Sequence, residues 1–377
     1  MNAFQPERII MACDYNGYSL RQLSQKIGKS PTYLSKIISE DDALTEQIVE
    51  QISFESGFPL TFFMQHDGKG FATEELTFRK KGRHSSRMLA KTGTEYRLLA
   101  EASRKLYDMC GIGDANKWLD AIAPTATMSI EDIETLTQQV RAALHINLSG
   151  AIRNMADVLD GLHIVVASLN QEAPDGKTDG VCRPARPYND TVIGLYTKDK
   201  TGDRIRFTLA HEFGHLILHR FRRPLSDDLM EREANRFASA FLFPRDDAMH
   251  AISTTTTLKD FMSIKAGWGV SMAALIYRAN ELGIIDSSRY KALYTHMANR
   301  RWLKNEPVAV TIEQPVLLQQ MVAQSFGDID DVYRPTASRH GVEGFLGLPF
   351  AMVNGWCRNE LWEREALGIG GIEGLLN

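Results

Sequence analysis

Histidine and glutamate residues at helical spacing are the groups in this 377-residue chain best suited to do chemistry. The pattern H-E-x-x-H occurs at His211, Glu212 and His215, within an apolar run. Residues four apart lie one above the other on a helix, so His211 and His215 can point at one metal ion. Glu212 lies beside that face and can act on water at the metal. Imidazole ligands in tetrahedral geometry favour Zn²⁺ as the cofactor.

The residues around this pattern favour a metal site over a chance match. An H-E-x-x-H string arises by chance in roughly one chain in a hundred of this length. Apolar residues predict a strongly buried helix here: Phe207, Leu209, Ala210, Phe213, Leu216 and Ile217. Two histidines and a glutamate are costly in such a helix unless they have partners. We therefore expect a metal site, either catalytic or structural.

A catalytic zinc site needs a third protein ligand and an open fourth position. His219 continues the four-residue spacing. It would lie about 12 Å from His211 along a straight helix that rises roughly 1.5 Å per residue, too far to share one ion. We expect His219 to be a helix-end residue or to support a ligand from behind.

The next predicted helix, residues 229–242, offers a better third ligand. Glu231 and Asn235 fall on one face, and the small residues Ala234 and Ala238 allow close packing on the first helix. Glu231 can then bind the metal while Asn235 hydrogen-bonds a ligand histidine. The alternative is that Glu231 is a solvated carboxylate, favoured at a helix start by the helix dipole.

A second glutamate on this helix, Glu233, is a weaker candidate. It points about 160° away from the face that carries Glu231 if the helix has roughly 3.6 residues per turn. We expect Glu233 to lie on the surface.

The two motifs together resemble a known family. The string AHEFGH, followed by EREANRFASAFLFP, closely resembles the ImmA/IrrE family of metallo-endopeptidases. The resemblance implies zinc binding by His211, His215 and Glu231, with Glu212 as the general base. It also implies a zincin-like fold, in which a small sheet packs on the H-E-x-x-H helix.

Composition places the chain among soluble globular proteins. Hydrophobic residues make up 44% and charged residues 24%, and the net charge of −4 argues against non-specific coating of nucleic acid. The cysteines Cys13, Cys110, Cys182 and Cys357 have no metal-binding spacing and are expected to be reduced thiols. The chain shows neither a basic-then-apolar leader nor an 18-residue apolar run. We expect a cytoplasmic protein without membrane contact.

The N-terminal residues predict a helix-turn-helix. Ser19 and Gln22 can form a capping box, and Gly28 can end that helix. Ser30 can cap a second helix with Pro31 in its first turn. The second helix of such a pair can enter the DNA major groove.

This segment is similar to the repressor-type (XRE-like) helix-turn-helix family over about 55 residues. The resemblance implies that Ser30, Thr32, Tyr33 and Lys36 face the groove. Residues 8–65 nevertheless carry five Lys or Arg residues against seven Asp or Glu residues, a net charge of −2. An acidic module binds phosphates poorly, so a role in protein contacts is the alternative.

A basic stretch follows the acidic module. Arg79, Lys80 and Lys81 begin a run of six basic residues that ends at Lys91 and contains no acid. The run can supply the missing phosphate contacts or be a solvated linker face.

The remaining pattern predicts an α+β fold that is mainly α. Helices are expected at 93–122, 130–145 and 151–159, and strands at 163–167, 180–183 and 191–196, with residues 192–196 nearest the cleft. The expected domains are a helix-turn-helix bundle (1–66), a basic linker and helical connector (67–148), a zincin-like metallopeptidase core (149–249), a helical module packed on it (250–306) and a C-terminal domain (307–377). No motif assigns a role to this last domain, so sensing and homodimerisation both stay open.

The resemblance implies a function for the whole chain. We expect a zinc endopeptidase and transcriptional regulator that cleaves a helix-turn-helix repressor in a stress or mobile-element response. His219 and Tyr196 are candidates for stabilising the oxyanion. One alternative is a DNA-binding regulator or antitoxin-like partner whose zinc site is structural or sensory, and a metal-dependent hydrolase of small molecules is another.

Overall fold

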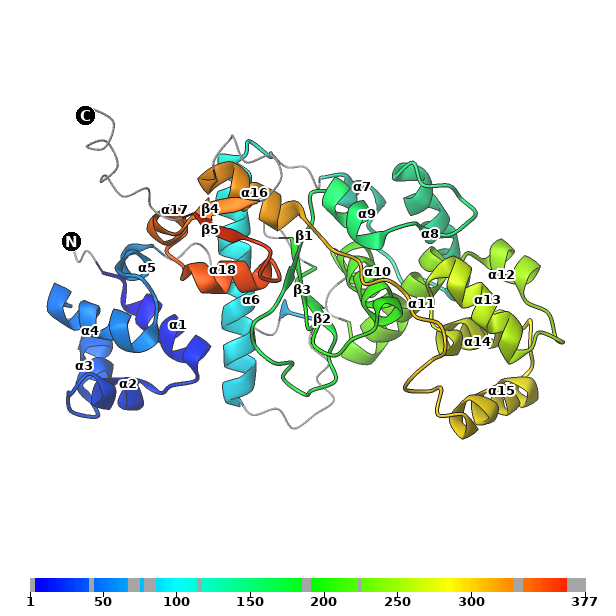
Figure 1. Cartoon of the computed structure of the whole chain (residues 1–377), viewed down its shortest axis with the longest axis horizontal. Coiled ribbons are helices and arrows are strands. Elements are labelled where there is room, and N and C mark those ends of the chain that lie inside the picture. The colour runs from blue at the N-terminus through cyan, green and yellow to red at the C-terminus, as the bar shows by residue number, and fades with distance from the viewer. Residues whose placement is uncertain are drawn as a thin grey trace, which may run out of the picture.

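The fold is mainly helical with a small sheet, which confirms the expected α+β class (Figure 1). The computed structural model describes residues 4–40, 44–66, 75–77, 86–113, 117–184, 191–222, 225–327 and 335–364. Within these ranges no helix is long and apolar enough to cross a membrane.

The N-terminal module is helical and includes the two helices expected to form a helix-turn-helix. Its helices are α1 (Pro6–Asn16), α2 (Leu20–Lys26), α3 (Tyr33–Glu40), α4 (Glu46–Ser56) and α5 (Leu60–Met64). The capping box of Ser19 and Gln22 forms as predicted. Helix α3 begins later than predicted, because Ser30 is followed by a turn in which its carbonyl accepts from the N–H of Tyr33 at 3.0 Å.

Helix α6 (Ser86–Met109) connects the N-terminal module to the rest of the molecule (Figure 1). On one side, Glu101 of α6 lies 2.8 Å from the buried guanidinium of Arg8 on α1. On another side, the buried carboxylate of Glu95 accepts hydrogen bonds from the N–H of Asn170 and the indole of Trp356. Helix α6 therefore holds together segments that lie far apart in the sequence.

The central sheet has three strands in the order β1-β3-β2. Strand β1 (Val165–Ser168) pairs in parallel with β3 (Val192–Leu195), which pairs antiparallel with β2 (Gly180–Cys182). Side chains alternate between two cores: Val165 packs on the α6 side and Val166 on the opposite side. Both faces are buried, which explains the nearly continuous apolar strands.

The position of β3 corrects one expectation. Residues 192–196 were predicted to lie nearest the cleft, but β3 is the central strand. The edge strand β2 is the one that packs on the helix carrying the H-E-x-x-H motif. Strand order depends on long-range pairing, which the alternation of apolar residues does not specify.

The second core joins the sheet to the helices between residues 118 and 299. These are α7 (Trp118–Ile122), α8 (Ile130–Ala143), α9 (Met155–Gly161), α10 (Gly202–Leu218), α11 (Asp227–Leu242), α12 (Arg245–Ala251), α13 (Leu258–Trp268), α14 (Met272–Glu281) and α15 (Ser287–Asn299). Figure 1 shows α12 to α15 at the end of the molecule opposite the N-terminal module.

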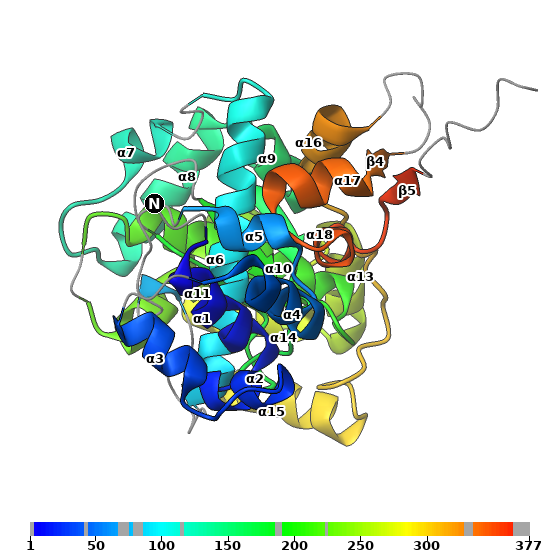
Figure 2. The same cartoon turned by 90° about the vertical axis from the view of Figure 1, so that its left-hand side faces the viewer.

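The C-terminal segment returns to the N-terminal half (Figures 1 and 2). It comprises α16 (Leu317–Phe326), β4 (Thr336–Ser338), α17 (Arg339–Gly341), a π-helical turn (Val342–Leu346), α18 (Phe350–Trp356) and β5 (Trp362–Arg364). Helix α16 packs on α6 and β1. The hydroxyl of Thr61 on α5 donates to the carbonyl of Glu343, so this segment shares a core with the N-terminal module.

Candidate metal centre

Two closely packed helices build the site. Helix α10 carries the H-E-x-x-H motif and α11 carries Glu231. A Cβ atom at Gly214 would lie 2.9 Å from Cδ1 of Phe237, so only glycine allows α10 to approach α11 so closely. Ala234 and Ala238 are fully buried, as their small size predicts for this interface.

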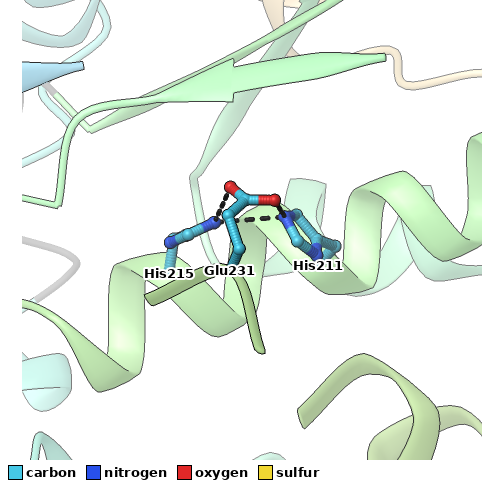
Figure 3. Close-up of side chains that lie close together, drawn as sticks. All are labelled: His211, His215 and Glu231. Carbon is cyan, nitrogen blue, oxygen red and sulfur yellow. Dashed lines mark hydrogen bonds and ion pairs between the residues drawn. The ribbon is translucent and has the colours of Figure 1, made fainter. Parts of the chain in front are cut away.

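The structure brings His211, His215 and Glu231 together (Figure 3). The Nε2 atoms of the two histidines lie 3.1 Å apart. The Glu231 carboxylate oxygens lie 3.4 Å from Nε2 of His215 and 3.8 Å from Nε2 of His211. Helical spacing places the two imidazoles on one face, and the packing of α11 brings the carboxylate to them.

The three groups fit a zinc ion in both chemistry and spacing. Zinc bonds of about 2.0–2.2 Å in a tetrahedron place neighbouring ligand atoms roughly 3.4 Å apart. The observed separations of 3.1, 3.4 and 3.8 Å bracket that value. Two imidazoles and one carboxylate leave a fourth position open, as in catalytic zinc sites.

Burial and hydrogen bonding set the ionisation of these groups in the metal-free protein. Burial lowers the pKa of His215 to about 3, so the ring is neutral and has a lone pair to offer a metal. Burial alone would raise the pKa of Glu231, but hydrogen bonds from His211 and His215 outweigh it and hold that pKa below its usual range. The site therefore presents a neutral His215 ring and a charged Glu231 carboxylate.

Glu212 lies next to the metal-binding group and is buried. Burial raises the pKa of its carboxyl to about 7, while the neighbouring His211 and a hydrogen bond from Cys182 act in the opposite direction. Its side chain lines the same small cavity, of about 130 Å³, as His211 and Glu231. A carboxyl that titrates near neutral pH beside a metal site is suited to proton transfer.

A chain of polar contacts runs behind the metal-binding group. The Nδ1 atom of His215 lies 2.9 Å from Nδ1 of His219, and Nε2 of His219 lies 3.1 Å from a carboxylate oxygen of Glu233. Arg222 donates to both oxygens of Glu233 at 3.0 Å. His219 thus contacts His215 from behind. Asn235, which was expected to support a ligand histidine, lines the cavity beside Glu231.

The expectation that Glu233 lies on the surface is wrong. Only 4% of this residue is exposed. Helix α11 packs against both α8 and α10, so the side away from the metal is also covered by protein. The ion pair with Arg222 supplies the countercharge that allows a buried carboxylate there.

A larger cavity of about 1170 Å³ adjoins the small one. Phe207 and Asn235 line both cavities. Apolar side chains such as Ile133, Leu229 and Tyr277 contribute to its wall. The region next to the metal-binding group can therefore accept bulky apolar side chains.

The small cavity includes residues that the sequence patterns did not single out. The hydroxyl of Thr77 lies 3.1 Å from Oε2 of Glu212, and the exposed Lys177 also lines the cavity. Thr77 is distant in sequence and belongs to no motif. The oxyanion candidates His219 and Tyr196 do not line this cavity, because His219 is buried behind His215 and Tyr196 packs on the α6 side of the sheet.

Four of the side chains expected to contact DNA lie on the N-terminal module. Ser30, Thr32 and Lys36 are exposed and Tyr33 is half-buried. Helix α3 lies at the outer end of the molecule (Figure 1). The basic residues Arg79, Lys80 and Lys81 lie outside the described residues.

Residues 161–280 match the family model of the Peptidase_M78, or IrrE N-terminal-like, domain. The matched range extends from the end of α9 into α14 and contains the sheet, the H-E-x-x-H motif and Glu231. The match supports the resemblance to the ImmA/IrrE family and a metallopeptidase activity for this region. No curated protein matches the chain.

Proposed function

We propose that this protein is a zinc-dependent endopeptidase that cleaves a helix-turn-helix repressor, and that its own helix-turn-helix module binds DNA. The observation that carries the proposal is the convergence of His211, His215 and Glu231 with Glu212 around one cavity. A purely structural metal site would not require a buried carboxylate directed at the same cavity. The match to a peptidase family supports the same reaction class.

The metal-binding residues and Glu212 would have separate roles in the reaction. His211, His215 and Glu231 would hold a zinc ion, which when bound polarises a carbonyl and lowers the pKa of water. Glu212 would accept a proton during attack on the peptide bond and deliver it to the leaving amine. Burial raises the pKa of Glu212 in the metal-free protein, whereas a zinc ion beside it would favour the charged carboxylate, which is the form that accepts a proton.

The neighbouring cavity has room for a peptide substrate. Its volume of about 1170 Å³ is large enough for several side chains, and part of its wall is apolar. A repressor as substrate is supported by the resemblance of the N-terminal module to repressor-type helix-turn-helix domains, which would place the peptidase near DNA-bound proteins.

The decisive experiment incubates the full-length, zinc-loaded protein with purified helix-turn-helix repressors from the source organism. Wild type is compared with Glu212→Gln, and fragments are identified by mass spectrometry. Because glutamine cannot accept a proton, the variant should cleave about 10²–10⁴-fold more slowly. Its zinc content should be unchanged. Cleavage by Glu212→Gln at the wild-type rate would exclude this site. Absence of any cleavage would favour a DNA-binding regulator with a structural zinc site.

A further inference from the structure

A short segment of the connector before α6 lies along the outer edge of β2. The N–H of Thr77 donates to the carbonyl of Cys182 at 2.9 Å, and the Thr77 hydroxyl accepts from the N–H of Cys182 at 2.8 Å. Leu76 is only 4% exposed and belongs to the core on the α6 side. The Glu75 carboxylate lies 2.9 Å from Nε of Arg183. Two hydrogen bonds to Cys182, apolar burial of Leu76 and an ion pair therefore hold residues 75–77, called the 75–77 segment below.

The 75–77 segment reaches the proposed general base. The Thr77 hydroxyl lies 3.1 Å from Oε2 of Glu212 and 3.0 Å from the carbonyl oxygen of Cys182, and either oxygen can accept its proton. Thr77 also lines the small cavity together with His211 and Glu231. With this contact in place Glu212 is only 3% exposed. The hydroxyl can thus occupy an acceptor site on the carboxylate that is expected to take protons during catalysis.

An incoming peptide would need the same edge. Strand β2 is at the edge of its sheet, and an unpaired strand edge binds an extended peptide through its backbone groups. A Cβ atom at Gly180 would lie 2.9 Å from Cγ of Glu212, which shows how closely β2 passes the proposed base. A peptide aligned on β2 would therefore run beside the metal-binding group. At Cys182 this edge is already occupied, because the Thr77 N–H and hydroxyl bind the carbonyl and the N–H of Cys182.

We propose that the 75–77 segment is an internal occupant of the peptide-binding edge and keeps the peptidase site latent until an extended substrate peptide displaces it. This inference rests on the proposed peptidase function. The contacts of the segment also indicate which peptides compete best. An acidic side chain opposite Arg183, followed by an apolar residue, would reproduce the contacts of Glu75 and Leu76.

A reversible crosslink tests the proposal in the full-length, zinc-loaded protein. The Thr77 hydroxyl oxygen lies 3.7 Å from the sulfur of Cys182, so a cysteine at position 77 is placed to form a disulfide with it. The variant Thr77→Cys carries Cys110→Ser to remove the partly exposed thiol. Fluorescein-labelled β-casein serves as the probe substrate, and the oxidised variant is compared with the same sample after reduction by a phosphine.

We expect the oxidised variant to cleave casein at least about tenfold more slowly than the reduced one, since the crosslink prevents displacement. Zinc content should be the same in both forms. Equal activity of the two forms would overturn the proposal. So would a loss of activity in Thr77→Ala that Thr77→Ser restores, because Thr77 would then be a working part of the site.

A thiol-labelling measurement separates this inference from the proposed function. If neither casein nor a repressor is cleaved, or if cleavage persists in Glu212→Gln, the peptidase proposal fails. Alkylation of Cys182 by N-ethylmaleimide, located by peptide mass spectrometry, still reports whether the segment covers the edge. Glu75→Arg should accelerate labelling severalfold, and the charge-swapped pair Glu75→Arg/Arg183→Glu should slow it again. Identical rates in wild type and Glu75→Arg would show that the segment does not control access to β2.

Discussion

The Nδ1 atom of His215 lies 2.9 Å from the Nδ1 atom of His219, while Nε2 of His215 faces His211 and Glu231. Metal binding requires a lone pair on Nε2, so the proton of neutral His215 belongs on Nδ1. It is then donated to His219, whose own proton lies on Nε2 and is donated to Glu233. One consistent set of tautomers thus links the metal-binding group to the buried pair of Glu233 and Arg222.

His219 should therefore tune metal affinity without being a ligand. Replacement by Phe removes the acceptor for the His215 proton, and loss of such a contact typically weakens metal binding by about 10–100-fold. Competition with a zinc chelator measures the dissociation constant. His296→Phe, at an exposed position on α15, is the matched control and should bind zinc like wild type. Unchanged affinity in His219→Phe would remove the proposed role.

Glu231 and Glu233 should behave differently as metal-site variants. Glu231→Ala removes a carboxylate that lies 3.4 Å from His215, so zinc affinity should fall by orders of magnitude. Glu233→Ala leaves all three ligand groups in place and should retain one zinc per chain at saturation. Elemental analysis of dialysed protein measures both. Loss of zinc from Glu233→Ala with retention by Glu231→Ala would reverse the assignment of the third ligand.

The buried pair of Glu233 and Arg222 should matter for stability. Glu233→Ala leaves a buried guanidinium without its countercharge, which typically costs about 3–5 kcal/mol of unfolding free energy. The double variant Glu233→Leu/Arg222→Met should recover most of this loss. The matched control is Glu131→Ala, which breaks an exposed pair with Arg245 and should cost at most about 1 kcal/mol. Urea unfolding of the zinc-loaded protein measures the unfolding free energy of each variant. A double variant that is less stable than Glu233→Ala would contradict the expectation.

The stability of the metal-free protein should depend on pH through Glu212. Burial raises its pKa from 4.5 to about 7, so the native state binds this proton more tightly than the unfolded chain does. The contribution to stability is therefore present below pH 4.5 and is lost as the pH rises towards about 7. Between pH 4.5 and about 7, the unfolding free energy of wild type should therefore fall by about 3 kcal/mol relative to that of Glu212→Gln. Urea unfolding in chelator at pH 4.5 and 7.5 tests this, and parallel pH profiles would contradict it.

DNA binding should be weak and strongly dependent on salt. Lys36 is exposed on α3, and Lys80 and Lys81 belong to the basic stretch that follows the acidic module. Each phosphate contact that is removed should reduce the slope of log affinity against log salt by about 1. Fluorescence anisotropy with duplex DNA measures this slope for wild type, Lys36→Ala and Lys80→Ala/Lys81→Ala. A salt-independent affinity, or wild-type binding by both variants, would favour a role of the module in protein contacts.

The sequence by itself determined the local geometry of this protein. The spacing of His211 and His215 places both imidazoles on one helical face, because the α-helix repeats every 3.6 residues or so. The capping box at Ser19 follows from contacts within a single turn. The small residues Ala234 and Ala238 predict that α11 approaches α10 closely, and that approach brings Glu231 to the histidines. Each inference uses residues close in sequence or a side-chain size that limits packing.

Only the tertiary structure decided what surrounds these elements. Glu233 is buried because α8 and Arg222 cover the side of α11 that periodicity assigned to solvent. The pairing of Thr77 with Cys182 and Glu212 joins residues more than a hundred positions apart. Periodicity shows which face of an element is apolar, but the choice of neighbour depends on the path of the whole chain. Partners so distant in sequence leave no periodic signal, and they meet only when both cores have formed.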